Sequence, residues 1–411
     1  MSCQKLSRQS LHLVLNEGRG LYSLRHMDVS KLFYPSTARA LEAKAKAKKK
    51  NGINKLGGIG SLPRPSIHYQ TFSSAVSNPN SLVNNVFALF GESKNKILFS
   101  DVEGHTNIYN TEFCSFTTMP SLNSPKGHNC MAAHITRTPA HARSDFDVNP
   151  ELDHGVFAQK PYGEHTDSLY MMDMGQDEPG CFEVLAYYPV GHWQWRALPS
   201  PPFFDDLEYK ACNNIAYAIV DGTQICVSSA TATYSFDTVT LEWSKTGDWV
   251  LPFHTKAEYV PELGLSASSP SDLCALELST AAIDYCDVPP MVQHVGLDVD
   301  LPKDWSLQSR TLVNLGSGRF CVAMFFHTAD AQDDPQVVAF TGVDVVPCGD
   351  NQQGQRTLRG IKHKSKYLIA DSVGHAASYD SPNGHLADGT REYLPSSEGQ
   401  QGMEAYRKKD S

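Results

Sequence analysis

Residues 215–243, which read IAYAIVDGTQICVSSATATYSFDTVTLEW, contain four short strand-like runs separated by turn residues. The runs span residues 215–220, 224–227 and 232–236, with a last run through Trp243. Asp221-Gly222 can join the first two runs, because Gly tolerates the positive φ of a tight hairpin turn and Asp bonds to its own following backbone. Four such strands within about forty residues predict one antiparallel sheet.

Weaker copies of this unit occur elsewhere, at a spacing of about 40 to 50 residues that is typical of a β-propeller rather than a sandwich. One copy comprises residues 86–90, 96–100, 106–109 and 114–119. Another comprises residues 156–158, 169–172, 182–187 and 193–198. Two less regular units follow, at 258–260 with 273–278, and at 311–315 with 319–326 and 337–345. The repetition predicts an all-β fold.

Strands from both ends of the chain are expected to close the ring. Residues 356–361 and 366–370 supply closing strands, and residues 11–15 and 21–24 can join them, which removes the free edges. At roughly 50 residues per blade, the span 67–370 holds about six four-stranded blades. We therefore predict a kelch-like β-propeller with this closure and one short N-terminal helix.

Four segments follow from this prediction. Residues 1–35 hold N-terminal strands that complete the last blade, and residues 36–65 hold a basic helix and a flexible linker. The propeller occupies residues 66–371, with an irregular insertion near 121–155 that is rich in Asn, His, Pro and Ala. Residues 372–411 are rich in Gly, Ser, Asp and Glu and have few large apolar residues, which predicts a disordered tail.

Positive charge is concentrated in the predicted helix, within a stretch that has no acidic residue from position 43 to position 91. The lysines are Lys44, Lys46, Lys48, Lys49 and Lys50. One interpretation is a nuclear-import patch or a contact for a polyanion, because the local field is strong. The other is a solvated Ala/Lys helix that Ser36-Thr37 caps and Asn51-Gly52 stops. Both remain open.

The composition limits the classes of partner and the cellular compartment that we expect. The 411 residues include 45 acidic and 35 basic side chains, a formal charge of −10. This balance argues against a phosphate-backbone binder, so nucleic acid is not the expected partner. No apolar run approaches the roughly 18 residues of a spanning helix, so no membrane contact is expected. With no secretory signal pattern and ten scattered cysteines without a CxxC pair, we expect a cytoplasmic or nuclear protein.

One cluster invites comparison with a metal site. The residues His128, Cys130, His134 and His141 carry the imidazole and thiol groups that zinc prefers. Their spacing matches no compact zinc motif, because closed sites usually place ligands in pairs two to four residues apart and only the first two are that close. A polar loop is the favoured interpretation, and we predict neither a metal nor a cofactor.

Motifs of known reaction centres do not occur in the sequence. It has no GxSxG elbow, no Walker loop and no GxGxxG fingerprint. We therefore predict no catalytic residue. Arg319, beside Gly316-Ser317-Gly318, is the candidate for a residue at the rim or in the channel of the ring.

Several longer phrases resemble a plant family known as domain of unknown function 1618. They include YSFDT at 234–238, GDWVLPF at 247–253, EYVPELGL at 258–265 and LVNLGSGRFC at 312–321. The resemblance extends from about Leu11 to about Asp371 and implies a kelch-like propeller without an established activity. The chain departs from the family after Leu265, where SASSP follows at once, so that blade is expected to lack part of a strand.

Two functions are compatible with these features. The first is a non-enzymatic scaffold for an unknown protein partner, because rigid blades that display variable loops suit recognition. The alternative is a propeller enzyme, or a binder of a small ligand or glycan, that uses the central channel. Polar and charged groups that converge on the channel would favour the alternative, and an apolar or filled channel would favour the scaffold.

Overall fold

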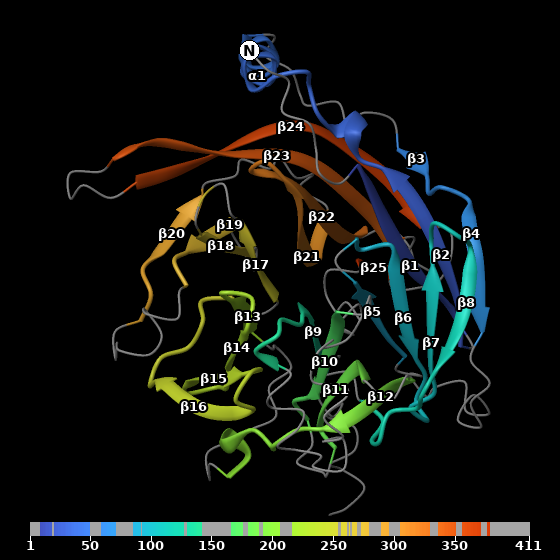
Figure 1. The fold of residues 1–411 in the computed structure, drawn as a ribbon. Coiled ribbons are helices and arrows are strands. Elements are labelled where there is room, and N and C mark those ends of the chain that lie inside the picture. Colours follow the sequence, from blue (N-terminus) through green and yellow to red (C-terminus); the bar gives the residue numbers. More distant parts are fainter. Residues whose placement is uncertain are drawn as a thin grey trace, which may run out of the picture.

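The fold is known here from a computed structural model. It describes residues 9–18, 20–49, 59–70, 85–91, 93–126, 130–141, 166–175, 180–188, 192–205, 216–253, 256–260, 263, 265–268, 273–278, 289–295, 305–328, 336–350, 356–370 and 376–378. The described strands are arranged radially around a centre, as in a β-propeller (Figure 1). The predicted all-β propeller with one short α-helix is confirmed.

Six four-stranded units, which we call blades 1 to 6, account for nearly all described strands. Blade 1 contains β25 (Ala376–Ser378), β1 (Ser10–Gly18), β2 (Leu21–Asp28) and β4 (Pro65–Gln70). Blade 2 contains β5 (Val86–Phe90), β6 (Lys96–Ser100), β7 (Thr106–Asn110) and β8 (Ser115–Met119). Blade 3 contains β9 (Cys130–Thr136), β10 (Asp167–Asp173), β11 (Phe182–Tyr188) and β12 (His192–Ala197).

Blades 4 to 6 follow the same order. Blade 4 contains β13 (Ala216–Val220), β14 (Gln224–Ser228), β15 (Thr233–Asp237) and β16 (Glu242–Gly247). Blade 5 contains β17 (Lys256–Val260), β18 (Leu265–Ser268), β19 (Leu273–Leu276) and β20 (Val292–Val295). Blade 6 contains β21 (Trp305–Gly316), β22 (Arg319–Thr328), β23 (Gln336–Asp350) and β24 (Arg356–Ala370), with β3 (Gly60–Ser61) added in parallel.

By hydrogen bonding, these blades form five sheets, because blades 4 and 5 share one eight-stranded sheet. Their innermost strands, β13 and β17, pair in parallel over only two positions, Tyr217 with Lys256 and Ala218 with Ala257. Within each of these blades the strands pair antiparallel. The prediction of about six four-stranded blades therefore agrees with the strand pairing.

Buried side chains between neighbouring blades hold the ring together. Six apolar clusters are each shared by two successive blades, and one of them joins blade 6 to blade 1. Between blades 3 and 4, the rings of Phe182 and Phe236 meet edge to face at 4.8 Å. Between blades 6 and 1, Phe340 packs in one cluster with Leu11. Since the last cluster returns to the first blade, the ring is closed.

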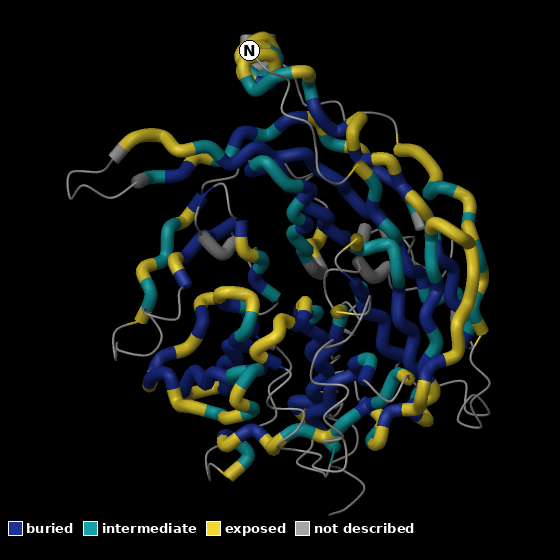
Figure 2. The backbone as a smooth tube through the Cα atoms, viewed as in Figure 1, coloured by how far each residue is buried: buried dark blue, intermediate teal, exposed yellow. Residues whose placement is uncertain are grey.

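Sequence patterns differ between the inner and outer strands because neighbouring blades cover the inner strands on both faces. An inner strand such as β5, VFALF, is covered on both faces by neighbouring blades and is apolar along almost its whole length. Outer strands such as β4 alternate between half-buried and exposed residues, and β8 is exposed at four of its five positions. Exposure is accordingly concentrated at the periphery of the ring (Figure 2).

Strands from both ends of the chain close the ring, as expected, but the C-terminal strand involved is a different one. The innermost strand of blade 1 is β25, which pairs antiparallel with β1 at Leu13–Ser378 and Leu15–Ala376. It lies in the segment 372–411 that was expected to be disordered; the rest of that segment is outside the described residues. The two closing strands predicted at 356–361 and 366–370 are instead one continuous strand, β24, in blade 6.

Two local predictions are corrected by the strand assignments. The first strand of blade 3 is β9, which lies inside the predicted irregular insertion at 121–155, whereas residues 156–158 are outside the described residues. Blade 5 has all four strands, because β18 begins at Leu265, where a shortened unit was expected. The sequence LSAS forms a short strand because it is paired on both sides, by β17 and β19.

The basic helix is present as α1 (Thr37–Lys49) and lies outside the ring (Figure 1). The hydroxyl of Ser36 accepts a hydrogen bond from the Arg39 backbone N–H at 3.3 Å, which caps the first turn as expected. A single turn of 3-10 helix, η1 (Ser30–Leu32), precedes α1, and α1 packs against β24. None of the helices described is long and apolar enough to cross a membrane.

Candidate functional site: a polar pocket at the centre of the ring

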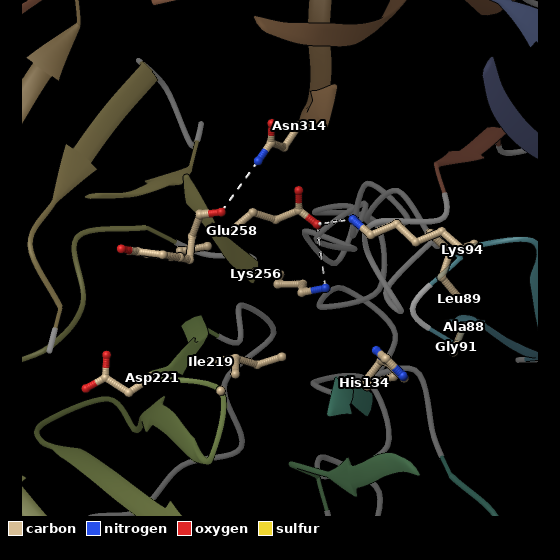
Figure 3. Close-up of a pocket in the computed structure, with 14 residues that line it drawn as sticks. Ala88, Leu89, Gly91, Lys94, His134, Ile219, Asp221, Lys256, Glu258 and Asn314 are labelled. Carbon is tan, nitrogen blue, oxygen red and sulfur yellow. Dashed lines mark hydrogen bonds and ion pairs between the residues drawn. The ribbon is translucent and has the colours of Figure 1, made fainter. Parts of the chain in front are cut away.

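A pocket of about 380 Å³ lies where the inner strands of five blades meet. Its walls come from β5, β9, β13, β17 and β21 and from the turns that follow β5 and β13. Leu89, Ile219 and several alanines supply apolar surface, while the charged side chain of Lys94, from blade 2, meets those of Lys256 and Glu258, from blade 5 (Figure 3). The volume is that of a site for a small ligand or for one inserted side chain.

The charged group at the centre of the pocket is Glu258. Its Oε1 lies 3.4 Å from Nζ of Lys94 and 3.7 Å from Nζ of Lys256. The Glu258 side chain is only 11% exposed, and its Oε2 is buried without a hydrogen-bond partner. Lys256 and Glu258 lie two residues apart on β17, and Ala257 and Tyr259 of the same strand line the pocket as well.

A second polar group lies on the wall formed by blades 2 and 3. Nε2 of His134 is 3.0 Å from Oδ1 of Asp167, whose other oxygen is 3.7 Å from Nζ of Lys96. Because a carboxylate only accepts, Nε2 of His134 carries the proton in this bond. Gly91 makes the arrangement possible: its φ is +87°, and a Cβ there would lie 3.0 Å from Oδ2 of Asp167.

The His134–Asp167 pair has the geometry of a base and the carboxylate that orients it in a hydrolase. Such a pair needs a nucleophile within hydrogen-bond reach. Among the described residues that line the pocket there is no Ser, Thr or Cys. The pair therefore provides a fixed imidazole for binding, and these residues do not form a complete catalytic triad.

The turn Asp221-Gly222 forms part of the pocket rim and has the predicted type. Both central residues have positive φ, +48° for Asp221 and +73° for Gly222, and the N–H of Thr223 donates to the carbonyl of Val220 at 3.2 Å. This geometry matches the right-handed twist of the flanking strands. On the opposite wall, Nδ2 of Asn314 donates to the carbonyl of Tyr259 at 3.5 Å and connects blades 6 and 5.

One face of the ring carries the pocket together with exposed aromatic side chains. In blade 2 the β5–β6 and β7–β8 turns lie at the same end of the sheet, where the N–H of Thr111 donates to the carbonyl of Asn95 at 2.8 Å. Phe113, in the β7–β8 turn, is 72% exposed, and Tyr259, which lines the pocket, is 51% exposed. We call this side of the ring the pocket face.

Arg319, the predicted rim or channel residue, does not line this pocket. It begins β22, is 7% exposed, and its Nε lies 3.1 Å from Oδ1 of Asp344. The other carboxylate oxygen accepts a hydrogen bond from the Thr37 hydroxyl at 2.7 Å and lies 2.9 Å from Nε2 of His363. The contacts of Arg319 and His363 are close but poorly aligned, so they are mainly electrostatic. The cluster ties α1 to blade 6.

The surroundings of Asp344 favour its ionised form. Burial by itself raises the pKa of Asp344, but the contacts from His363 and Thr37 and the positive charge of Arg319 outweigh burial and lower the pKa below its ordinary value. The N–H of Tyr34 donates to Nδ1 of His363 at 3.1 Å, which leaves Nε2 as the proton-bearing nitrogen that faces Asp344.

The predicted lysine patch is partly described. Lys44 and Lys46 lie on α1, half-buried and exposed respectively. Lys48 and Lys49 belong to the helix backbone, but their side chains, like the whole of Lys50, are outside the described residues. The part of the patch that is described lies on a helix outside the ring and away from the pocket (Figure 1).

The candidate zinc ligands do not come together in the described region. Cys130 and His134 are four residues apart on β9, about 13 Å along a strand, and His128 is outside the described residues. Burial raises the pKa of the Cys130 thiol, which opposes the thiolate that a metal needs. Nε2 of His141 is 3.1 Å from the Thr238 hydroxyl in the interior. No group of three potential ligands occurs among the residues described.

Most of the pocket was not found from the sequence. Of the lining residues, the sequence singles out His134 only as a possible zinc ligand and Asp221-Gly222 only as a turn. Lys94, His134 and Glu258 come from three blades that only ring closure brings together. One local signal was available. Lys256 and Glu258 alternate with Ala257 in a strand that should be buried, which indicates a polar face toward the channel.

Comparison with known proteins places the chain in a family. The model of a protein family of unknown function, DUF1668, matches residues 8–369, which include every blade except for the closing strand β25. The chain belongs to the DUF1668 family. The match agrees with the expected kind of family, although its number is 1668 rather than 1618. Plant origin and the kelch-like character of this DUF1668 protein stay predictions.

Among solved structures, similar chains include the β-propeller domain of Cps50 (Swd1) from Myceliophteria thermophila, with a TM-score of 0.37, 8% identity, and 81% of this chain and 94% of that chain covered. A protein of unknown function from Bacteroides thetaiotaomicron has a TM-score of 0.36 and 10% identity, with 73% of this chain and 68% of that chain covered. The WD40 domain of SCAP from fission yeast has a TM-score of 0.32 and 10% identity, with 89% of this chain and 91% of that chain covered. No curated protein matches the DUF1668 chain. At these scores the similarities support no functional argument.

Proposed function

We propose that this protein is a non-enzymatic β-propeller scaffold that binds a protein partner with its pocket face. The observation that carries the proposal is the exposure of two large aromatic side chains on that face, Phe113 at 72% and Tyr259 at 51%. Aromatic residues dominate the energetically important contacts of protein interfaces. The pocket beside Tyr259 offers a polar cavity into which a partner side chain can insert.

A protein partner also agrees with the charge of the chain. The net charge of −10 repels a nucleic-acid backbone. The ring itself is a rigid platform, because its blades are joined by buried clusters on all sides. Little ordering of the scaffold is then needed when a partner binds, which favours affinity.

The scaffold proposal is tested by affinity purification of the tagged protein from cells that naturally express it. The wild type should recover a reproducible partner, and the double variant Phe113→Ser, Tyr259→Ser should lose it. Val250→Ser is the matched control, because Val250 is an exposed apolar residue that follows β16 at the opposite end of blade 4. Absence of a reproducible partner, or equal capture by the double variant, would contradict the proposal.

A second candidate function is the binding of a small ligand in the central pocket. The specific observation in its favour is the convergence of Lys94, Lys256 and Glu258, in which one carboxylate oxygen has no hydrogen-bond partner. A propeller enzyme is the weaker alternative, since the described lining residues supply no nucleophile beside His134. Protein binding and ligand binding would use the same face of the ring.

We also propose that the protein acts in the cytoplasm or the nucleus, with the five lysines between positions 44 and 50 as an import signal. Replacing Lys44, Lys46, Lys48, Lys49 and Lys50 with Gln should lower the nuclear fraction of a fluorescent fusion, because importin recognition needs the local positive charge. Lys364→Gln, Lys366→Gln is the control, as both are exposed lysines of β24. An unchanged distribution of the five-lysine variant would remove the targeting role.

A further inference from the structure

The outer side of blade 6 carries a concentration of positive charge. α1 and β24 each contain five Lys or Arg residues, whereas Glu42 of α1 is the single acidic residue in the two sequences. The helix packs against the strand, so the two sets of charges lie in one region outside the ring (Figure 1). The chain as a whole has a formal charge of −10. This region therefore has the opposite sign of charge from the chain as a whole.

Four of these basic side chains are exposed and available to a partner. They are Lys46 of α1 and Arg359, Lys364 and Lys366 of β24, which we call the basic surface. None of the four forms an ion pair with a carboxylate in the described part of the chain, and Glu42 is engaged by Arg39 at 3.1 Å. Nζ of Lys364 lies 4.8 Å from the centre of the Tyr34 ring, a contact that leaves its charge uncompensated.

The register of β24 places its outermost exposed bases on one face of the sheet. Arg359 is opposite Val346 and Lys366 is opposite Phe340 in the pairing with β23. Directly opposite side chains of an antiparallel pair point to the same face, and positions 340 and 346 are an even number of residues apart. A β-bulge of β24 between the two bases reverses the alternation that their odd spacing would otherwise follow. The bases thus line one face over about 23 Å of strand.

Charge complementarity selects an acidic peptide as the partner. Lys364 and Lys366 are two residues apart and repel each other, which an anionic partner offsets. A nucleic-acid backbone or a membrane extends beyond the basic surface and would be repelled by the remaining, acidic part of the chain. A short acidic segment can contact the basic surface alone. The exposed Leu41 of α1 and the half-buried Tyr34 offer apolar contacts beside the charges.

From these features we infer that the basic surface binds a short acidic segment of a partner protein, in which an apolar residue accompanies the carboxylates. The segment lies along the face of β24 that carries Arg359 and Lys366, with its carboxylates against the exposed bases. This surface is outside the ring, whereas the pocket face is formed by the turns around the centre. The inference therefore goes beyond the proposed function and does not depend on it.

Fluorescence anisotropy with the purified full chain tests the inference with two labelled decapeptides. One peptide has glutamates around a central phenylalanine-leucine pair, and the other has glutamine in place of every glutamate. At about 0.1 M salt the glutamate peptide should bind at least about tenfold more tightly. This preference should disappear near 1 M salt, where the Debye length is about 3 Å. Equal affinity for the two peptides at low salt would overturn the inference.

Variants locate the binding site. Lys366→Gln should weaken the glutamate peptide about threefold, and the double variant Lys364→Gln, Lys366→Gln about tenfold. Lys245→Gln is the matched control, because it removes the same charge from an exposed lysine that already pairs with Asp248 on blade 4. It should leave the affinity nearly unchanged. An equal loss in Lys366→Gln and Lys245→Gln would show a response to net charge alone and would overturn the site.

Further probes distinguish the other occupants. A ten-nucleotide oligothymidine and vesicles with phosphatidylserine should both bind more weakly than the glutamate peptide, and tighter binding of either would overturn the choice of partner. Self-association in analytical ultracentrifugation that the double lysine variant abolishes would instead identify a second copy of the chain as the occupant. Circular dichroism and the melting curve of each variant show whether it is folded.

The test is independent of the tests of the scaffold and of import. Phe113→Ser, Tyr259→Ser should bind the glutamate peptide like the wild type, because both side chains belong to the pocket face. The double variant Lys364→Gln, Lys366→Gln should keep the partner captured by the pocket face, and its two positions are outside the proposed import signal. Loss of peptide binding in the aromatic variant, with its fold intact, would place the acidic segment on the pocket face and overturn the inference.

Discussion

Asp344 and Glu258 are both carboxylates that lie between two basic side chains, but their surroundings differ. Both oxygens of Asp344 are engaged, by contacts of 2.7 Å to 3.1 Å from Thr37, His363 and Arg319. Glu258 uses one oxygen, at 3.4 Å and 3.7 Å. The Asp344 cluster joins distant parts of the chain, whereas Glu258 lines a pocket. A carboxylate between two basic side chains thus joins parts of the fold in one place and lines a pocket in the other.

The largest effect is expected from Asp344→Ala. This change removes the carboxylate that opposes the charge of the buried Arg319 and that faces the Nε2–H of the buried His363, which should lower the free energy of unfolding by about 3 kcal/mol. Urea denaturation at neutral pH measures the change. Asp248→Ala is the control, because Asp248 pairs with Lys245 at an exposed position and should contribute little. Equal stability of the two variants would mean that Asp344 contributes no more than an exposed ion pair, which would contradict its structural role.

The dependence of stability on pH sharpens the comparison further. The pKa of Asp344 is lower in the folded chain than its ordinary value of 3.8, so its contribution is present above that value and is lost as the pH falls below it. Between about pH 5 and about pH 3, the free energy of unfolding of the wild type should fall more steeply than that of Asp344→Asn. Identical slopes in urea titrations across this range would contradict the assigned role.

A smaller effect is expected from Thr37→Val, which removes the hydroxyl that joins α1 to Asp344. Loss of this hydrogen bond to a charged group should cost about 1.5 kcal/mol. Hydrogen exchange of the α1 amides should accelerate as well, because the helix loses an attachment to blade 6. Ser36→Ala, which removes only the cap, serves as the comparison: it should fray the first turn while Asp344 keeps its partner.

Blade 4 shows which parts of the fold can be predicted from the sequence. Its turn Asp221-Gly222 needs two residues with positive φ, and few residue types other than Asp, Asn and Gly accept that conformation. Its inner strand, AYAIV, is short, apolar and bounded by turn residues. Local chemistry therefore determines both the strand ends and the pairing. The same signals placed all four strands of blade 2 within one residue of their observed bounds.

Blade 3 shows where such prediction fails. Its inner strand β9, CMAAHIT, contains two alanines and a histidine, which have no strong strand preference, and it is buried on both faces, so no alternation marks it. The strand is instead stabilised by its partner β10 and by the packing of Met131 and Ile135 against blade 4. The long stretch of sequence between β9 and β10 also hid the hairpin from a reading of local turns.

The closing strand and the pocket were missed for a related physical reason. β25 is held by pairing with β1, more than 350 residues earlier in the sequence, and its own residues, Ala-Ala-Ser, carry no strand signal. Likewise, Lys94 and Glu258 meet only because blades 2 and 5 face the same centre. Contacts between distant parts of the chain leave no trace in local periodicity, whereas turns and apolar runs do.

The smallest effect is expected from Glu258→Gln, and it decides whether the comparison holds. Because Lys94 is half-exposed and both contacts of Glu258 are long, removing the charge should change the free energy of unfolding by less than about 1 kcal/mol in urea denaturation. The buried atom at the place of Oε2 then belongs to a neutral amide, which costs less to bury than a carboxylate, and this offsets part of the lost attraction. A loss as large as that of Asp344→Ala would make Glu258 a structural residue, and its exposure to a pocket would then need another explanation. A near-neutral result would mean that the fold does not require a carboxylate at this position, so a requirement for it in binding would belong to the ligand.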